Sequence, residues 1–164
     1  MALEEFMFKT GEFVLKNGFG VLEIVEVLTE CFVPSALPVE YYKLVSLDKK
    51  TVVNVPVVGA GELISPVLTK KQAKNILDDI LQFAVSLDPN EKVRRKFLES
   101  KLNGGRKECL VVVGSVLKRV ADGKKLAYFE KSALEIAGDK VFSEIAFVLG
   151  ISKEEAKNKA LAWA

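Results

Sequence analysis

Any catalytic chemistry in this chain would have to come from carboxylates, lysines or two cysteines, because the sequence contains no histidine. Without histidine the chain lacks the commonest general base, the usual catalytic triads and any zinc ligand of the imidazole type. Asp78-Asp79 is an adjacent acidic pair, but neighbours on a helix point about 100° apart and do not converge on a substrate. Cys31 and Cys109 are far apart and have no metal-ligand spacing. We therefore predict a protein that is not an enzyme and that uses no cofactor, metal ion or small-molecule substrate.

The charged residues are distributed unevenly between the two halves of the chain. Residues 1–69 contain five lysines and nine acidic residues, a balance of −4, whereas residues 70–164 contain 19 lysines or arginines and 13 acidic residues, a balance of +6. A basic half beside an acidic half indicates that the second half binds nucleic acid. The alternative is a lysine-rich surface that only contacts solvent.

Length and composition predict a folded protein with two small modules. The chain has 164 residues, 49% of them hydrophobic, and its strand and helix patterns are segregated along the sequence. An apolar residue follows each cysteine, so we expect reduced, packed thiols. No signal peptide precedes Phe8, and no apolar run approaches the roughly 20 residues of a spanning helix. We expect a cytoplasmic protein that does not enter a membrane.

The first module shows a strand pattern from Phe8 to about Val58. Runs rich in Val, Leu, Ile, Phe and Tyr are broken at Asn17-Gly18, at the segment from Pro34 to Pro38, and at Asp48-Lys49-Lys50. Four or five short strands with tight turns are typical of a small SH3-like or Tudor-like barrel. A strand, and not a helix, follows the Gly-Phe-Gly turn, so this turn is not a phosphate-binding loop.

The pattern becomes helical at Thr69. Thr69 and Gln72 form a capping box, and apolar residues then recur at helical spacing as far as Ala84. A second helix start lies at Asp88-Pro89-Asn90-Glu91, with proline at the first helical position, and this helix should end at Asn103-Gly104-Gly105.

Three further helices are predicted after Gly105. Residues 106–121 favour a helix despite the strand-forming Val111 to Val113. A long helix spans about 128–149, and the pattern leaves open an interruption at Gly138-Asp139. Ser152 and Glu155 then cap a last helix that ends near Trp163. The sequence thus predicts a two-domain α+β protein, with a barrel at 1–68 and about five helices at 69–164.

Several short stretches have an order and spacing that resemble a known family. These are FKTGEFV, GFGVLEIVE, EYYKL and VVNVPV in the first module, and RRKF, VLKRVADGKKL and FSEIAFVLGISKEEA in the second. From Phe8 to about Ala160 the chain resembles the CarD/CdnL family of bacterial transcription regulators that bind RNA polymerase. Its first module is also similar to the polymerase-interacting domain of the transcription-repair coupling factor.

The resemblance implies that the Tudor-like domain docks on the RNA polymerase β subunit. The helical domain would then contact promoter DNA near the upstream edge of the melted region and modulate open-complex stability. A polymerase-bound regulator of this kind associates with the nucleoid. The DNA contacts that the resemblance implies centre on the second helix of that domain and on one lysine of a neighbouring helix: Arg94, Arg95 and Lys131. Nearby lysines add charge by sequence proximity alone: Lys92, Lys96, Lys124 and Lys125. The implied polymerase contacts are Leu28, Glu30 and Asn54.

Two positions depart from the family pattern. Lys92 stands where typical members have a tryptophan that wedges against the minor groove, and a lysine can contact phosphate but cannot wedge. Asn54 stands where members commonly have a basic residue, and the strand around Leu28 also lacks the expected arginine. A second reading therefore stays open: a general DNA-binding or adaptor protein with a Tudor-like interaction domain and no bubble-stabilising activity.

Overall fold

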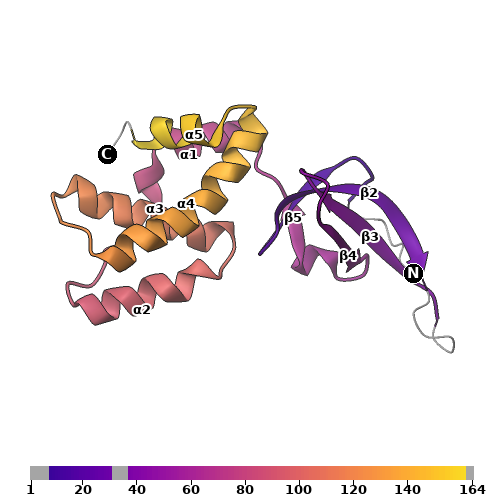
Figure 1. Cartoon of the computed structure of the whole chain (residues 1–164), viewed down its shortest axis with the longest axis horizontal. Helices are drawn as coiled ribbons and strands as arrows, with labels where there is room; N and C mark the ends of the chain where they lie inside the picture. The colour runs from indigo at the N-terminus through magenta and orange to yellow at the C-terminus, as the bar shows by residue number, and fades with distance from the viewer. Residues whose placement is uncertain (1–7, 31–36, 162–164) are drawn as a thin grey trace. The chain divides into compact units, whose positions relative to one another are not determined.

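The computed structural model describes residues 8–30 and 37–161, so Cys31 and Trp163 lie outside the described residues. The chain forms two compact units, Met1–Val67 and Leu68–Ala164, which we call the sheet unit and the helical unit (Figure 1). The division falls one residue before the domain boundary expected from the sequence.

The sheet unit contains one antiparallel sheet whose strands follow the order β4-β3-β2-β1-β5. Its strands are β1 (Phe13–Lys16), β2 (Gly20–Glu30), β3 (Val39–Ser46), β4 (Val52–Pro56) and β5 (Ile64–Pro66). A short 3-10 helix, η1 (Ala60–Glu62), connects the last two strands. Together with the helices of the second unit, this sheet confirms the α+β class.

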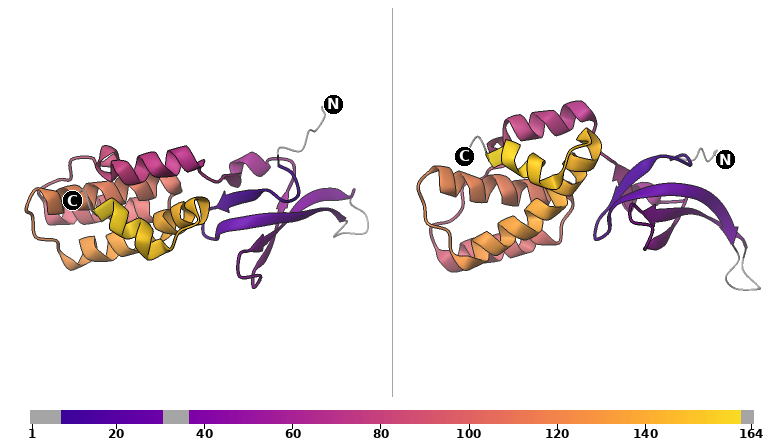
Figure 2. Two further views of the ribbon diagram at one scale, coloured as in Figure 1. Left: turned by 90° about the horizontal axis from the view of Figure 1, so that it is seen from above. Right: turned by 45° about the horizontal axis from the view of Figure 1, so that its top comes forward.

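The predicted SH3-like or Tudor-like barrel is not confirmed, because the sheet is curled but open (Figure 2). Strands β4 and β5 form its two edges, and no backbone pairing joins them among the described residues. These strands have only five and three residues, and η1 separates them along the chain. β4 therefore keeps an unpaired edge.

Strand alternation gives the sheet one buried face. Leu22 and Ile24 of β2, with Tyr42 and Leu44 of β3, are fully buried. The hydroxyl of Tyr42 accepts a hydrogen bond from the backbone N–H of Phe8. The predicted tight turn between β1 and β2 is confirmed, since Gly18 and Gly20 have φ values of 88° and 75°. Only glycine adopts such values without strain.

The described residues of the helical unit form five α-helices and one 3-10 helix. These are α1 (Lys70–Asp78), η2 (Ile80–Phe83), α2 (Glu91–Leu102), α3 (Arg106–Ala121), α4 (Tyr128–Leu149) and α5 (Lys153–Leu161). The helix predicted for residues 106–121 is confirmed. The capping box of Thr69 and Gln72 is also confirmed, and Ser152 caps α5 by accepting a hydrogen bond from the Glu155 N–H.

Two details of the helices differ from the sequence-based prediction, and a third settles a point that the prediction left open. Helical spacing continues to Ala84, but α1 ends at Asp78 and the chain tightens into η2. Pro89 does not occupy the first helical position, because Asn90 is the N-cap of α2 and its side chain accepts a hydrogen bond from the Val93 N–H. Helix α4 runs without interruption through Gly138.

A close backbone approach explains the end of α1. A Cβ atom added to Gly114 of α3 would lie 2.9 Å from the carbonyl oxygen of Ile80 and 3.0 Å from the amide nitrogen of Ala84. The tight η2 turn therefore packs directly on α3 where that helix has no side chain. The Val85 N–H also donates to the hydroxyl of buried Ser115.

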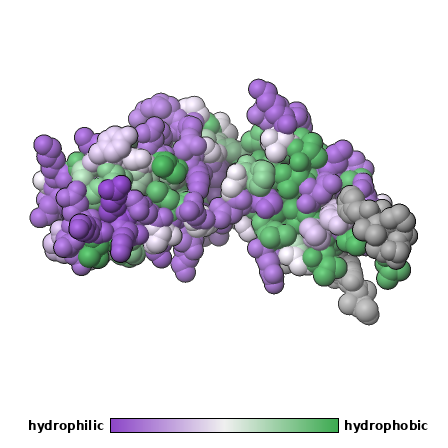
Figure 3. All heavy atoms as spheres, turned by 60° about the horizontal axis from the view of Figure 1, so that its bottom comes forward, coloured by the Kyte–Doolittle hydropathy of each residue, from purple (hydrophilic) through white to green (hydrophobic). Residues whose placement is uncertain are grey.

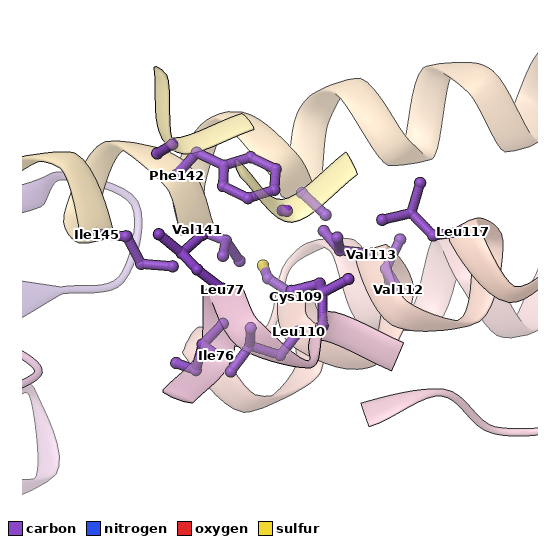
Figure 4. Packing of buried hydrophobic residues seen from close by; sticks show 14 of the residues in the cluster. Ile76, Leu77, Cys109, Leu110, Val112, Val113, Leu117, Val141, Phe142 and Ile145 are labelled. Atoms are coloured by element: carbon purple, nitrogen blue, oxygen red, sulfur yellow. The ribbon is translucent and has the colours of Figure 1, made fainter. Parts of the chain in front are cut away.

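The helical unit has a continuous apolar core. Cys109 is a buried free thiol that lies among Leu77, Leu110, Val113 and Val141 (Figure 4). Burial in these surroundings raises the pKa of the Cys109 thiol, and Lys140 opposes this shift. The thiol thus stays protonated and serves as a small core residue.

Candidate nucleic-acid interface

The predicted DNA-binding residues come from three neighbouring segments of the helical unit. Lys92, Arg94, Arg95 and Lys96 lie on α2, which packs against both α3 and α4. The other three lie on the loop between α3 and α4 and in the first turn of α4: Lys124, Lys125 and Lys131. All of these side chains are exposed except that of Arg94.

One buried carboxylate fixes the arrangement of these segments. The side chain of Glu130, in the first turn of α4, is fully buried. Its Oε1 accepts hydrogen bonds from Arg94 Nη2 of α2 at 3.3 Å and from the backbone N–H of Ala127 at 3.0 Å. Its Oε2 accepts one from Arg119 Nε of α3 at 2.5 Å. We call Arg94, Arg119 and Glu130 the Glu130 cluster.

Arg94 is therefore a structural residue in this conformation. It is 6% exposed, and its Nη1 donates to the backbone carbonyls of Asp88 and Pro89, both at 3.1 Å. Its Nε is buried and has no hydrogen-bond partner among the described residues. A guanidinium held in this way cannot contact a phosphate unless α2 and α4 separate. The DNA contact expected of Arg94 from the sequence thus conflicts with the burial of its side chain. The side chain of the adjacent Arg95 is exposed.

Arg95 remains accessible at the surface. Its Nε donates to Glu99 at 2.9 Å, but both side chains are more than half exposed. An exposed ion pair of this kind contributes about 0–1 kcal/mol, so a phosphate can replace the carboxylate at little cost. The Arg95 guanidinium also lies 5.9 Å from the ring centroid of Phe129, which brings it to the start of α4.

The predicted lysines are exposed and lie on α2, in the loop before α4 and in the first turn of α4. Lys92 and Lys96 are four residues apart on α2, a spacing that places them on the same outward face. Lys124 and Lys125 follow a turn at Gly123, whose φ is 77°, and the Lys124 N–H donates to the carbonyl of Arg119. In the view of Figure 3, hydrophilic side chains cover most of the helical unit. Such a surface can bind a phosphate backbone but has no defined geometry for reading bases.

The three residues implied in polymerase binding share one face of the sheet. Leu28 pairs with Tyr41 across β2 and β3, and Asn54 pairs with Lys43 across β3 and β4. Residues paired across strands, or two apart along a strand, point to the same side. Glu30 therefore belongs with Leu28 and Asn54 on the face opposite the buried Tyr42 and Leu44. We call this surface, which ends at the unpaired edge of β4, the outer face.

Sequence reasoning missed two features of the helical unit. Glu144 is buried and accepts hydrogen bonds from Arg106 Nε at 2.7 Å, from Arg106 Nη2 at 2.6 Å and from the Leu68 N–H at 2.8 Å. It is the one charged residue in the apolar run from Val141 to Leu149, a signal that could have indicated a buried ion pair. Tyr128, in contrast, is 85% exposed, and no sequence signal distinguished it from its half-buried neighbour Phe129.

The described residues contain no group of three or more cysteine and acidic side chains that could hold a metal ion. Among the same residues, no helix combines the length and the apolar character needed to cross a bilayer.

Comparison with known proteins adds no further assignment: no protein-family model matches the chain, and no curated protein is significantly similar to it.

Proposed function

We propose that this protein is a transcription regulator that bridges the RNA polymerase β subunit and promoter DNA near the upstream edge of the melted region. In this proposal the Tudor-like sheet unit binds polymerase, and the helical unit binds DNA and modulates open-complex stability. The protein works as a cytoplasmic, nucleoid-associated adaptor and catalyses no reaction. The observation that carries the proposal is the set of exposed cations that the Glu130 cluster holds together on one unit.

The charge distribution supports a separate role for each unit. The cations gathered from α2, α4 and the loop before α4 belong to the unit with a balance of +6, whereas the sheet unit has a balance of −4. Phosphate contacts provide most of the affinity of DNA binding that does not depend on sequence. An acidic sheet unit repels DNA, which leaves the outer face available for a protein partner.

The geometry of the outer face supports strand addition as the docking mode. The unpaired edge of β4 offers backbone donors and acceptors to an extended segment of a partner. Asn54 lies on β4 beside this edge, where its side chain can contact an added strand, whereas Leu28 lies two strands away on β2 of the same outer face. Backbone hydrogen bonds make such docking tolerant of sequence differences, including Asn54 in place of a basic residue.

A DNA-binding assay at several salt concentrations tests the helical unit. In the full-length protein, Arg95→Ala with Lys131→Ala should weaken binding to duplex DNA and reduce the slope of log K against log salt by about two. The matched control, Lys71→Ala with Lys74→Ala, also removes two positive charges, but from α1. It should reduce the slope less than the first double variant does. Equal slopes for the two double variants would contradict the proposed DNA surface.

Capture of purified RNA polymerase tests the sheet unit. Full-length protein should retain the polymerase, and Asn54→Glu on the exposed side of β4 should weaken capture while leaving DNA binding unchanged. Wild-type protein that binds DNA but captures no polymerase would favour the second candidate, a general DNA-binding or adaptor protein. Lys92, an exposed lysine on α2 in place of a wedging aromatic side chain, is the observation that favours that candidate.

A further inference from the structure

Tyr128 is a large aromatic side chain that the fold leaves without a packing role. It is the first residue of α4 and is 85% exposed, whereas the next residue, Phe129, lies against the guanidinium groups of Arg94 and Arg95 at 5.6 and 5.9 Å. The two adjacent rings therefore differ in function. Phe129 helps to hold α2 against α4, and Tyr128 presents its ring to the solvent.

Several basic residues lie close to Tyr128 along the chain or near the start of α4. Lys131 lies three residues later on α4, a spacing that places it on the same side of the helix. Lys124 and Lys125 lie in the loop before α4, separated from Tyr128 by Leu126 and Ala127. The Arg95 guanidinium lies over the ring of Phe129 in the first turn of α4. The nearest acidic residue in the sequence, Glu130, is fully buried and bonded to two arginines, so its charge is compensated within the fold.

Charged residues follow Tyr128 on its side of α4. The next exposed residues along the helix are Lys131 and Glu135, and the next exposed apolar residue, Ile136, comes only after both of them. A protein or lipid partner would need a broader apolar area around the ring. An aromatic ring with basic residues nearby instead fits a nucleotide, whose base stacks on the ring while the neighbouring phosphates contact the cations.

We propose that Tyr128 stacks on an unpaired base of DNA at a junction between duplex and single strand, with Lys131, Lys124, Lys125 and Arg95 holding the adjacent phosphates. The inference rests on the proposed function, in which the helical unit binds DNA at the edge of a melted region. Stacking requires only the flat face of a base, so this contact distinguishes unpaired from paired DNA without selecting a sequence.

The test compares a forked duplex with a blunt duplex that has the same number of phosphates. Wild-type full-length protein should bind the fork more tightly. Tyr128→Ala should weaken fork binding by about tenfold, the effect of losing one base stack, and leave blunt-duplex binding and its salt slope unchanged. Tyr128→Phe keeps the ring and should behave like the wild type. Tyr128→Ala should fold normally, because the side chain is exposed.

Phe19→Ala is the matched control, because Phe19 is a half-exposed ring of the sheet unit with Lys16 Nζ 5.2 Å from its centroid. It should not change binding to either DNA. Photocrosslinking from 5-iododeoxyuridine at the first unpaired position gives a direct readout, and the crosslink should map to Tyr128.

The outcomes separate the inference from the proposed function. Equal binding of fork and blunt duplex by the wild type, or equal losses on both DNAs for Tyr128→Ala, would overturn the stacking inference while the proposed DNA binding stands. A crosslink that maps to another residue would also overturn it. Failure of the wild type to bind either DNA would refute both the inference and the proposed DNA-binding role.

Discussion

Replacement of Glu130 by glutamine tests whether the Glu130 cluster holds the helical unit together. The substitution keeps the size and shape of the side chain but removes its negative charge. Arg94 and Arg119, whose side chains are 8% and 18% exposed, then face a neutral amide. The amide NH2 group also replaces one of the two carboxylate oxygens, so one guanidinium meets a donor where it had an acceptor.

The expected loss follows from burial. Removing one partner of a buried ion pair costs about 3–5 kcal/mol, because the remaining charge stays buried without compensation. Arg119 is partly accessible to water, which favours the lower end of this energy range. We therefore expect Glu130→Gln to reduce the free energy of unfolding by about 3 kcal/mol. For a unit of this size, that loss lowers the melting temperature by about 12–24 °C.

Circular dichroism at a helical wavelength follows unfolding of the helical unit in the full-length protein, by heat and by urea. Glu99→Gln is the matched control, because Glu99 also bonds an arginine but its side chain is 58% exposed. This control should change stability by less than about 0.5 kcal/mol. If Glu130→Gln destabilises the protein no more than Glu99→Gln does, the view that the buried ion pairs of the Glu130 cluster stabilise the helical unit is refuted.

A triple variant separates loss of charge balance from loss of packing. Arg94→Met, Arg119→Met and Glu130→Met together remove all three charges while retaining flexible side chains of similar length. If uncompensated arginines cause the loss in Glu130→Gln, the triple variant should be more stable than that single variant. A triple variant as unstable as the single one, or less stable, would show that shape and hydrogen bonding dominate.

Two further predictions concern the core of the helical unit. Gly114→Ala should destabilise the protein by about 1–3 kcal/mol, because the new Cβ meets the η2 backbone at 2.9 Å. The matched change Gly138→Ala on α4 meets only a phenylalanine side chain at 3.5 Å and should stabilise the helix by about 0.5–1 kcal/mol in urea unfolding. Equal effects of the two changes would contradict the close approach. Burial raises the pKa of the Cys109 thiol and shields the sulfur, so peptide-resolved alkylation at pH 8 should be slower in native than in unfolded protein. Since the folded-state pKa is the higher one, the contribution of this thiol to stability is intact below the ordinary thiol pKa and is lost as the pH rises above it; equal alkylation rates would show that the thiol is accessible.

Local signals explain which parts of the fold could be predicted. The Thr69 and Gln72 capping box and the Ser152 cap involve residues only three apart, so the sequence contains the complete interaction. Helix α3 was predictable because its length and ends outweigh the strand preference of three consecutive valines. The end of α1 was not predictable, because it depends on contact with Gly114, which lies more than thirty residues later.

The candidate site was only partly predictable for the same reason. The sequence indicates a cluster of positive charge around α2, but it cannot say which arginine of the Arg94-Arg95 pair points inward. That direction depends on Glu130, which is 36 residues from Arg94 and occupies a position where an acid is ordinarily exposed near a helix start. The exposure of Tyr128 likewise depends on how α4 packs against α2, which helical spacing alone does not determine.

The shared carboxylate of Glu130 also constrains how this protein can change in evolution. Because two arginines on different helices bond the same buried group, substitutions at positions 94, 119 and 130 should be tolerated only in combination. Arg95 has an exposed, replaceable partner and should vary independently, although it is adjacent to Arg94 in the sequence. In a saturation mutagenesis library selected for folding, position 95 should therefore accept many substitutions and position 94 few. Position 94 should covary with positions 119 and 130, and position 95 should covary with neither.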